Sequence, residues 1–208
     1  IVFIIAFFIV GCLFGYKKLH SDERKNEIIK MFNKELLNNF IESKKSVIER
    51  LKIANDKEEG NKIYTEYVAT NKLMLEKINN EHSVLLENVF MKDTKYNFTP
   101  EEWKIANNFL KDYDLELIDM GQGNAMIVQV PNFYYDIFKD YVSDAYKEYL
   151  KITADKNEGN FADDAGITIT FKELADRIIV WENFMKKYPD ADKDLKKNVK
   201  EKVLQYRN

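Results

Sequence analysis

The fold is decided by two neighbouring stretches of the chain, 22-DERKNEIIKMFNKELLNNFIESKKSVIERLKIA-54 and 61-NKIYTEYVATNKLMLEKINNEHSVLLENVF-90. In both stretches, large apolar residues recur at the spacings that place them on one face of an α-helix. Turn-forming residues separate the two: Asn55, Asp56 and Gly60. Two long helices with a short connection predict an antiparallel helical hairpin. The apolar stripes consist of Ile28, Ile29, Phe32, Leu36, Phe40, Ile48 and Leu51 in the first stretch, and of Ile63, Tyr67, Met74, Ile78, Leu85 and Val89 in the second.

Further helices are predicted after this hairpin, and two of them begin at capping boxes. Thr99 with Glu102, and Thr170 with Glu173, have the spacing at which a Thr and a Glu side chain satisfy free backbone N–H groups at a helix start. An aromatic-rich segment also favours a helix, packed mainly in the core, with a binding groove as the alternative use of its tyrosines. The predicted helices span residues 100–112, 133–150, 171–188 and 191–206. Trp181 lies at helical spacing from Ile178 and Phe184, so we expect it to be buried between the last two helices and the aromatic-rich helix.

Between residues 115 and 130 the apolar pattern changes. The β-prone runs LELIDM (115–120) and AMIVQV (125–130) flank the turn-forming Gly121-Gln122-Gly123-Asn124. Such a pattern is typical of a β-hairpin. The sequence therefore predicts a mainly α fold, a helical hairpin plus a helical body, with one small β-hairpin near residues 115–130.

Composition and charge restrict the function of this 208-residue chain. A single Cys excludes an internal disulfide framework and a multi-Cys zinc site. Residues 58–185 carry 13 basic and 24 acidic residues, so this part of the chain would repel a phosphate backbone. We therefore expect no nucleic-acid partner.

The N-terminal run IVFIIAFFIVGCLFGY, residues 1–16, carries no charge. As a helix it would extend about 24 Å, less than the roughly 30 Å of a bilayer's hydrocarbon core. This is the length of the apolar region of a signal peptide. We expect a signal peptide or membrane anchor over 1–16, a tether and the first long helix over 17–60, and a helical body over 61–208. No clear stop signal ends the body, which is compatible with truncation at the C-terminus.

Within the apolar run, Ile9-Val10-Gly11-Cys12 resembles a bacterial lipobox. The resemblance implies a membrane lipoprotein: cleavage before Cys12, a diacylglyceryl thioether on its sulfur, and acylation of its amine by a chain such as palmitate. Two or three acyl chains give a stable membrane anchor. An uncleaved signal anchor is the alternative, although Lys17 and Lys18 would then lie on the outer side, against the positive-inside tendency. Either reading places the body on the extracytoplasmic face of a bacterial membrane.

The last helix pair carries a second, weaker resemblance. Phe184-Met185-Lys186-Lys187-Tyr188-Pro189 is similar to the F-x-x-x-Y-P end of the first helix in tetratricopeptide-like repeats of bacterial envelope lipoproteins. The resemblance implies one helix-turn-helix unit over about the last 35 residues. The chain departs from the pattern at Lys196 and Lys197, where small residues are expected at the helix contact.

No catalytic, metal or cofactor site is predicted, because the sequence lacks the familiar nucleophile, zinc and phosphate-loop motifs. His82 lies on the second helical stripe and is expected to be a core residue with satisfied hydrogen bonds. Asp190, Asp192, Asp194 and Glu201 have the spacing of an EF-hand, but Leu195 replaces its required Gly, so acidic residues at a helix start explain them better. Residues 153–170 are predicted to form a loop, and 155–166 fail as a calcium site.

These observations predict a membrane-anchored extracytoplasmic lipoprotein with a binding or scaffold role in the cell envelope, and they favour a non-enzyme over an enzyme. Its expected partners are membrane lipid and, beyond the anchor, another envelope protein or a cell-wall glycan. The alternative is an acidic hydrolase acting on envelope glycans, since scattered carboxylates could form a catalytic pair.

Overall fold

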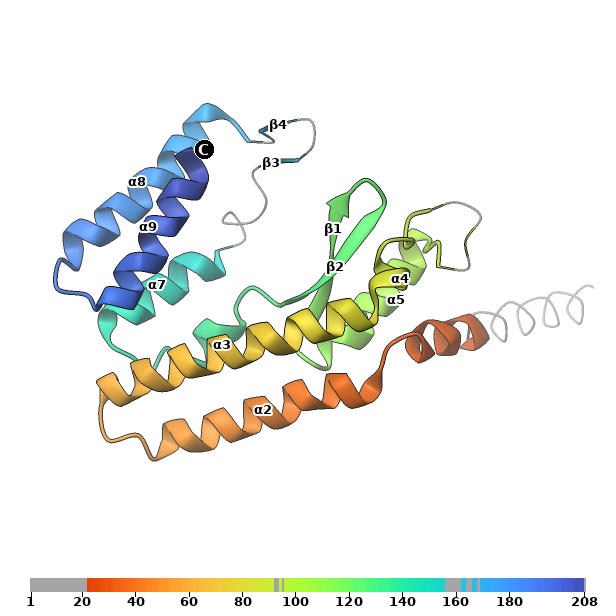
Figure 1. Ribbon diagram of the computed structural model, residues 1–208, viewed down its shortest axis with the longest axis horizontal. Helices are drawn as coiled ribbons and strands as arrows, with labels where there is room; N and C mark the ends of the chain where they lie inside the picture. The colour runs from red at the N-terminus through yellow and green to blue at the C-terminus, as the bar shows by residue number, and fades with distance from the viewer. Residues whose placement is uncertain are drawn as a thin grey trace, which may run out of the picture.

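The computed structural model describes residues 22–91, 94, 96–155, 162–163, 166–167 and 169–207. It confirms a mainly α fold with a small β-hairpin (Figure 1). Residues 22–30 are helical. The elements that follow are α2 (Lys34–Lys52), α3 (Lys57–Glu81), α4 (Ser83–Leu86), α5 (Pro100–Lys111), β1 (Leu115–Gly121), β2 (Asn124–Gln129), α6 (Phe133–Phe138), α7 (Asp144–Ala154), β3 (Ala162–Asp163), β4 (Gly166–Ile167), α8 (Phe171–Lys187) and α9 (Lys193–Arg207).

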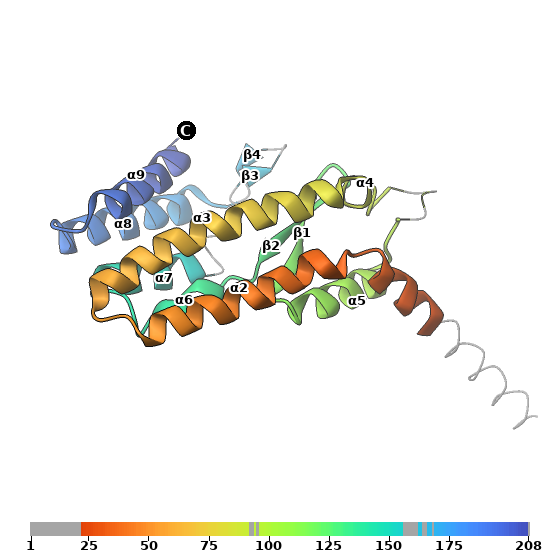
Figure 2. The ribbon, with the colours of Figure 1, turned by 60° about the horizontal axis from the view of Figure 1, so that its bottom comes forward.

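The predicted helical hairpin is confirmed, and it runs along the length of the molecule (Figure 2). Two hydrophobic cores are built on it. Near the turn of the hairpin, buried residues of α2 and α3 such as Leu51 and Tyr67 pack against α6, α7, α8 and α9. Near its open end, Leu37 and Ile78 pack with residues 28–32, α5 and the β-hairpin. Both hydrophobic cores therefore include residues of the α2–α3 hairpin.

A polar layer separates the two cores. The Lys44 ammonium lies 2.7 Å from an Asp114 carboxylate oxygen. The completely buried Asn71 donates through Nδ2 to Gln129 Oε1 at 2.8 Å and to the Tyr134 hydroxyl at 2.6 Å. These two bonds satisfy the Asn71 amide nitrogen and join β2 and α6 to α3, whereas its Oδ1 has no hydrogen-bond partner among the described residues.

The first long helix is interrupted, which corrects the prediction of one helix over 22–54. Asn33 caps α2, because its Oδ1 accepts from the backbone N–H groups of Glu35 and Leu36 at 3.1 and 3.3 Å. Its own N–H donates to His82 Nε2 at 2.9 Å. The other ring nitrogen, Nδ1, must then carry the proton that it shares with the Ile78 carbonyl at 2.7 Å. His82 is thus a buried, hydrogen-bonded core residue, as expected, and it joins the two arms of the hairpin.

The start of the second long helix also differs from the prediction. Helix α3 begins at Lys57, after the Asp56 cap, so Gly60 lies in its first turn instead of breaking the chain before residue 61. A Cβ placed on Gly60 would lie 1.9 Å from the backbone oxygen of Tyr141. Gly60 is therefore present because the first turn of α3 touches the backbone after α6.

The aromatic-rich segment forms two helices where one over 133–150 was predicted. The chain turns at residues 139–143, and Asn61 from α3 holds that turn. Its Oδ1 accepts from the N–H of Ser143 at 2.9 Å and its Nδ2 lies 3.2 Å from the Ser143 hydroxyl. The turn lets the aromatic rings of α6 and α7 surround Tyr64, which contacts Phe138 and Tyr146 edge-on. The prediction that these aromatics pack mainly in the core is confirmed for the buried Phe138, Tyr146 and Tyr149.

The β-hairpin forms as predicted, with Leu117 paired to Ile127 and both side chains buried. At its turn, Gly121 and Gly123 adopt positive φ angles of 81° and 86°, which glycine tolerates best. Helices α5 and α8 begin where the sequence indicates, and both capping boxes, at Thr99 and at Thr170, are present. Helix α9 begins at Lys193, two residues after its predicted start.

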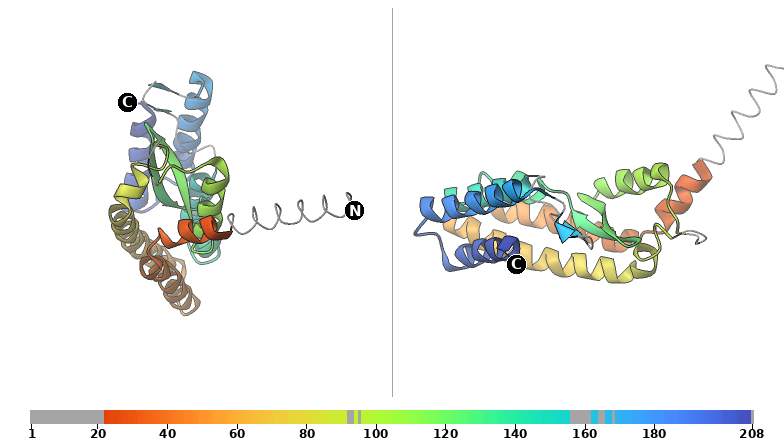
Figure 3. Two further views of the ribbon diagram at one scale, coloured as in Figure 1. Left: turned by 90° about the vertical axis from the view of Figure 1, so that its right-hand side faces the viewer. Right: turned by 90° about the horizontal axis from the view of Figure 1, so that it is seen from above.

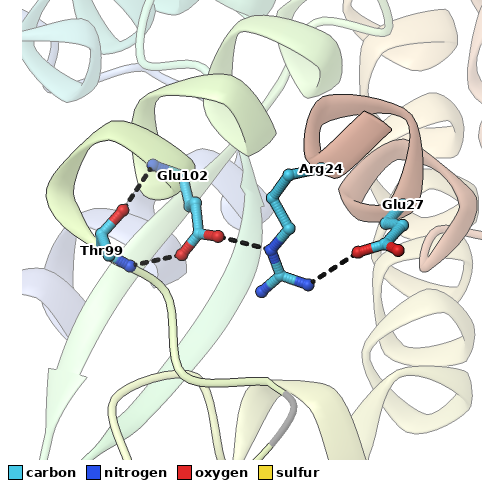
Figure 4. Close-up of polar contacts among 4 residues, drawn as sticks. All are labelled: Arg24, Glu27, Thr99 and Glu102. Atoms are coloured by element: carbon cyan, nitrogen blue, oxygen red, sulfur yellow. Dashed lines mark hydrogen bonds and ion pairs between the residues drawn. The ribbon is translucent and has the colours of Figure 1, made fainter. Parts of the chain in front are cut away.

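An ion pair joins residues 22–30 to α5 (Figure 4). The Arg24 guanidinium contacts Glu102 Oε1 at 2.5 Å and Glu27 Oε2 at 3.2 Å. Burial raises the pKa of Glu102, but hydrogen bonds from Arg24 and from the Thr99 backbone outweigh it and leave that pKa below its ordinary value. The carboxylate that closes the Thr99 capping box therefore also holds the N-terminal helix.

Candidate functional site

The main candidate site is a groove between α7 and α8 that extends to α6. It has a volume of about 1120 Å³. Its walls are mostly charged or tyrosyl side chains, with Ile152 and Val180 as the apolar part. We call it the α7–α8 groove, and it is lined by Tyr135, Asp144, Lys147, Glu148, Lys151, Ile152, Asp155, Glu173, Asp176, Arg177, Val180, Lys187 and Tyr188.

One end of the groove is organised around Glu148. Its Oε2 accepts from the Tyr188 hydroxyl at 2.8 Å and forms an ion pair with the Lys187 ammonium. The hydrogen bond from Lys187 is the main reason that the pKa of Glu148 lies below its ordinary value; the bond from Tyr188 acts in the same direction. Glu148 is therefore a carboxylate anion at neutral pH, and it ties α7 to the end of α8.

The charges along the groove nearly cancel. Five carboxylates and four cationic side chains line it. Lys147 and Lys151 lie one turn apart on α7, are exposed, and form no ion pair with a described residue. Glu173 is held by the capping box, and the backbone N–H and hydroxyl of Thr170 lower its pKa. A groove with both charge signs and half-buried tyrosines offers hydrogen bonds and ring faces without selecting a strongly charged ligand.

A second groove lies next to the Glu148 end of the α7–α8 groove. It is formed by the start of α7, the start of α3 and the α8–α9 connection. Its volume is about 830 Å³, and it shares Asp144, Lys187 and Tyr188 with the first. The acidic run Asp190 to Asp194 lines it, and Asp192 accepts from the Leu195 N–H at 2.9 Å. Asp192 is thus the cap of α9.

Among the described residues, no three His, Cys, Asp or Glu side chains gather where they could hold a metal ion.

The described residues include Trp181 but leave out some other predicted features. Trp181 is completely buried beside Tyr149 and Phe184, with ring centroids 5.6 and 6.0 Å away, which confirms it as a core residue. Cys12 and half of the predicted 153–170 loop lie outside the described residues. In the described ranges, no helix is both long and apolar enough to cross a bilayer.

The sequence analysis offered a groove on the aromatic-rich segment as an alternative, but it did not predict the charged residues that line the α7–α8 groove. Its α7 residues, Asp144, Lys147, Glu148 and Lys151, follow helical spacing and look like an ordinary solvated face. The only signal was Tyr188 before Pro189, which ends α8 close to α7.

Comparison with models of known protein families, with curated proteins and with solved structures found no match to this chain. Its function must therefore be inferred from its own surfaces.

Proposed function

We propose that this chain is a membrane-anchored lipoprotein on the extracytoplasmic face of a bacterial membrane, where it acts as a binding and scaffold protein of the cell envelope. In this proposal the α7–α8 groove binds a cell-wall glycan. The groove is the observation that supports the proposal most directly. Residues 22–30 lie at the opposite end of the molecule from α7 and α8 (Figure 3), so an anchor before residue 22 would hold the groove away from the membrane.

A polymer fits this groove better than a small metabolite does. Small-molecule pockets usually have volumes of about 300–1,000 Å³ and mostly apolar walls. The α7–α8 groove reaches about 1120 Å³, and nine of its 13 lining residues are charged. Sugars present hydroxyl groups to charged side chains and flat apolar faces to aromatic rings, and Tyr135 and Tyr188 supply such rings here.

Binding also accounts for the acidic residues better than glycan hydrolysis, the alternative function. A glycosidase needs a carboxylic acid with a raised pKa as the proton donor, next to a second carboxylate. In this groove the pKa values of Glu148 and Glu173 both lie below their ordinary range, because each accepts hydrogen bonds as an anion. These two carboxylates are suited to hold neighbouring side chains and to accept hydrogen bonds from sugar hydroxyls.

Filling the groove should weaken glycan binding. Val180 lines the groove and is 42% exposed, whereas its neighbour Ile179 is 49% exposed and does not line it. We expect Val180→Trp in the full chain, held in lipid nanodiscs, to weaken binding of soluble cell-wall glycan strands at least about tenfold, which corresponds to about 1.4 kcal/mol. The matched Ile179→Trp variant should bind like the wild type in calorimetric titration. Absence of glycan binding to the wild type, or equal binding by both variants, would contradict the proposal.

The anchor is tested separately through Cys12. When the full chain is produced in a bacterium supplied with a labelled fatty acid, Cys12→Ser should reduce incorporation to background and release the protein from the membrane fraction, because no thioether can form. A Cys12→Ser protein that carries as much label as the wild type would refute lipidation. An unlabelled protein that stays membrane-bound would favour the uncleaved signal anchor.

A further inference from the structure

A third groove of the molecule has an apolar floor and has no role in the function proposed above. It is a groove between α8 and α9 with a volume of about 470 Å³. Met185, Val199, Val203 and Leu204 supply its apolar part. Val199 is completely buried at its base, whereas Leu204 is 55% exposed at its edge. We call this surface the α8–α9 face.

Cationic side chains surround the α8–α9 face. Lys186 and Lys200 are both exposed, and neither forms an ion pair with a described residue. Arg207 also lines the face, but Glu182 neutralises it at 2.9 Å. The apolar groove therefore has a rim with two unneutralised positive charges.

We propose that the α8–α9 face binds an amphipathic helix of a partner protein, whose apolar stripe is flanked by acidic side chains. A groove between two packed helices accepts a third helix, which places apolar residues at helical spacing into it. The acidic flanks of such a helix would meet Lys186 and Lys200. Charges at the rim of an interface mainly set its specificity and its association rate, so they select an acidic helix over a basic one.

Two other occupants fit the observations less well. In a two-fold dimer each copy presents the same surface to the other, so the cationic rims would face each other and repel. A membrane surface would meet the charges, but amphipathic helices bind a bilayer through a protruding apolar face. Here Val199 forms the completely buried base of a groove.

The test uses the full chain in phosphatidylcholine nanodiscs, with empty nanodiscs as the reference. The probes are two synthetic amphipathic helical peptides with the same leucine stripe, flanked by Glu in one and by Lys in the other. We expect the Glu peptide to bind more tightly than the Lys peptide. Leu204→Glu should weaken its binding at least tenfold. The matched variant Leu73→Glu changes a leucine on α3 that is 65% exposed, and it should bind within twofold of the wild type.

Charge reversal tests the choice of partner. Lys186→Glu with Lys200→Glu should reverse the preference, so that the Lys peptide binds more tightly. Lys77→Glu with Lys104→Glu makes the same change in net charge at exposed sites on α3 and α5, and it should leave the preference unchanged. Binding of neither peptide, equal binding of both, or an unchanged preference after the reversal at Lys186 and Lys200 would overturn the proposal. It would also be overturned if Leu204→Glu abolished self-association of the chain, or its adsorption to vesicles containing phosphatidylglycerol, while peptide binding persisted.

Discussion

Replacing Trp181 with alanine is expected to lower the free energy of unfolding by roughly 3–5 kcal/mol, the usual cost of removing a buried Trp or Phe side chain. Trp181 has no exposed surface and contacts the rings of Tyr149 on α7 and Phe184 on α8. The tightly packed neighbours cannot fill the cavity completely, because they belong to helices with their own contacts. Since a domain's total stability is about 5–15 kcal/mol, this one change would remove a large part of it.

The measurement is the denaturant midpoint followed by circular dichroism, which does not depend on tryptophan emission. Val180→Ala is the matched control, because Val180 is adjacent on α8 and 42% exposed. We expect this control to change stability by no more than about 0.5 kcal/mol. A loss below about 1 kcal/mol in Trp181→Ala would show that the side chain does not support the core in solution.

The second large effect is expected from Gly60→Ala, and its sign is opposite to the usual one. In an exposed helix, alanine in place of glycine stabilises by about 1 kcal/mol. At Gly60 the added methyl group would lie 1.9 Å from the Tyr141 backbone oxygen. A backbone atom cannot rotate away as a side chain can, so α3 and the 139–143 turn must separate. We expect a loss of about 3 kcal/mol, at the upper end of the usual cost of overpacking.

Thermal or chemical unfolding of Gly60→Ala can be compared with that of Glu58→Ala, an exposed position in the same helical turn. The control should stay within about 0.5 kcal/mol of the wild type. If Gly60→Ala were as stable as the wild type or more stable, the close contact between α3 and the turn after α6 would be wrong.

Helix starts, stripes and the β-hairpin were predictable because short segments encode them. The Thr99 and Thr170 capping boxes join residues three positions apart, and both are present. The β-hairpin depends on two glycines at positive φ between paired strands. The burial of Trp181 also followed from its position between apolar residues at helical spacing.

The breaks in the helices were missed because their causes are distant in the sequence. The N–H of Asn33 is satisfied by His82, which lies 49 residues away. The turn before α7 is held by Asn61 through a contact between residues 82 positions apart. Asn33 and Ser143 are residue types that favour helix starts. Helical periodicity nevertheless continues through both breaks in the sequence, so the apolar pattern marks neither of them.

By itself, the sequence determined the fold class and the approximate order of the elements. The lipid anchor at Cys12 remains a prediction, and it rests on the local residue pattern alone. Only the tertiary structure decided which surfaces are open. Lys147 and Glu148 look like any solvated helix face until α8 packs beside α7 and turns that face into the wall of a groove. In the same way, Leu204 is one of several apolar residues of the last helix in the sequence, and the packing of α9 on α8 leaves it 55% exposed. The physical reason is that periodicity shows which residues share a helix face, whereas exposure depends on which other helices cover that face.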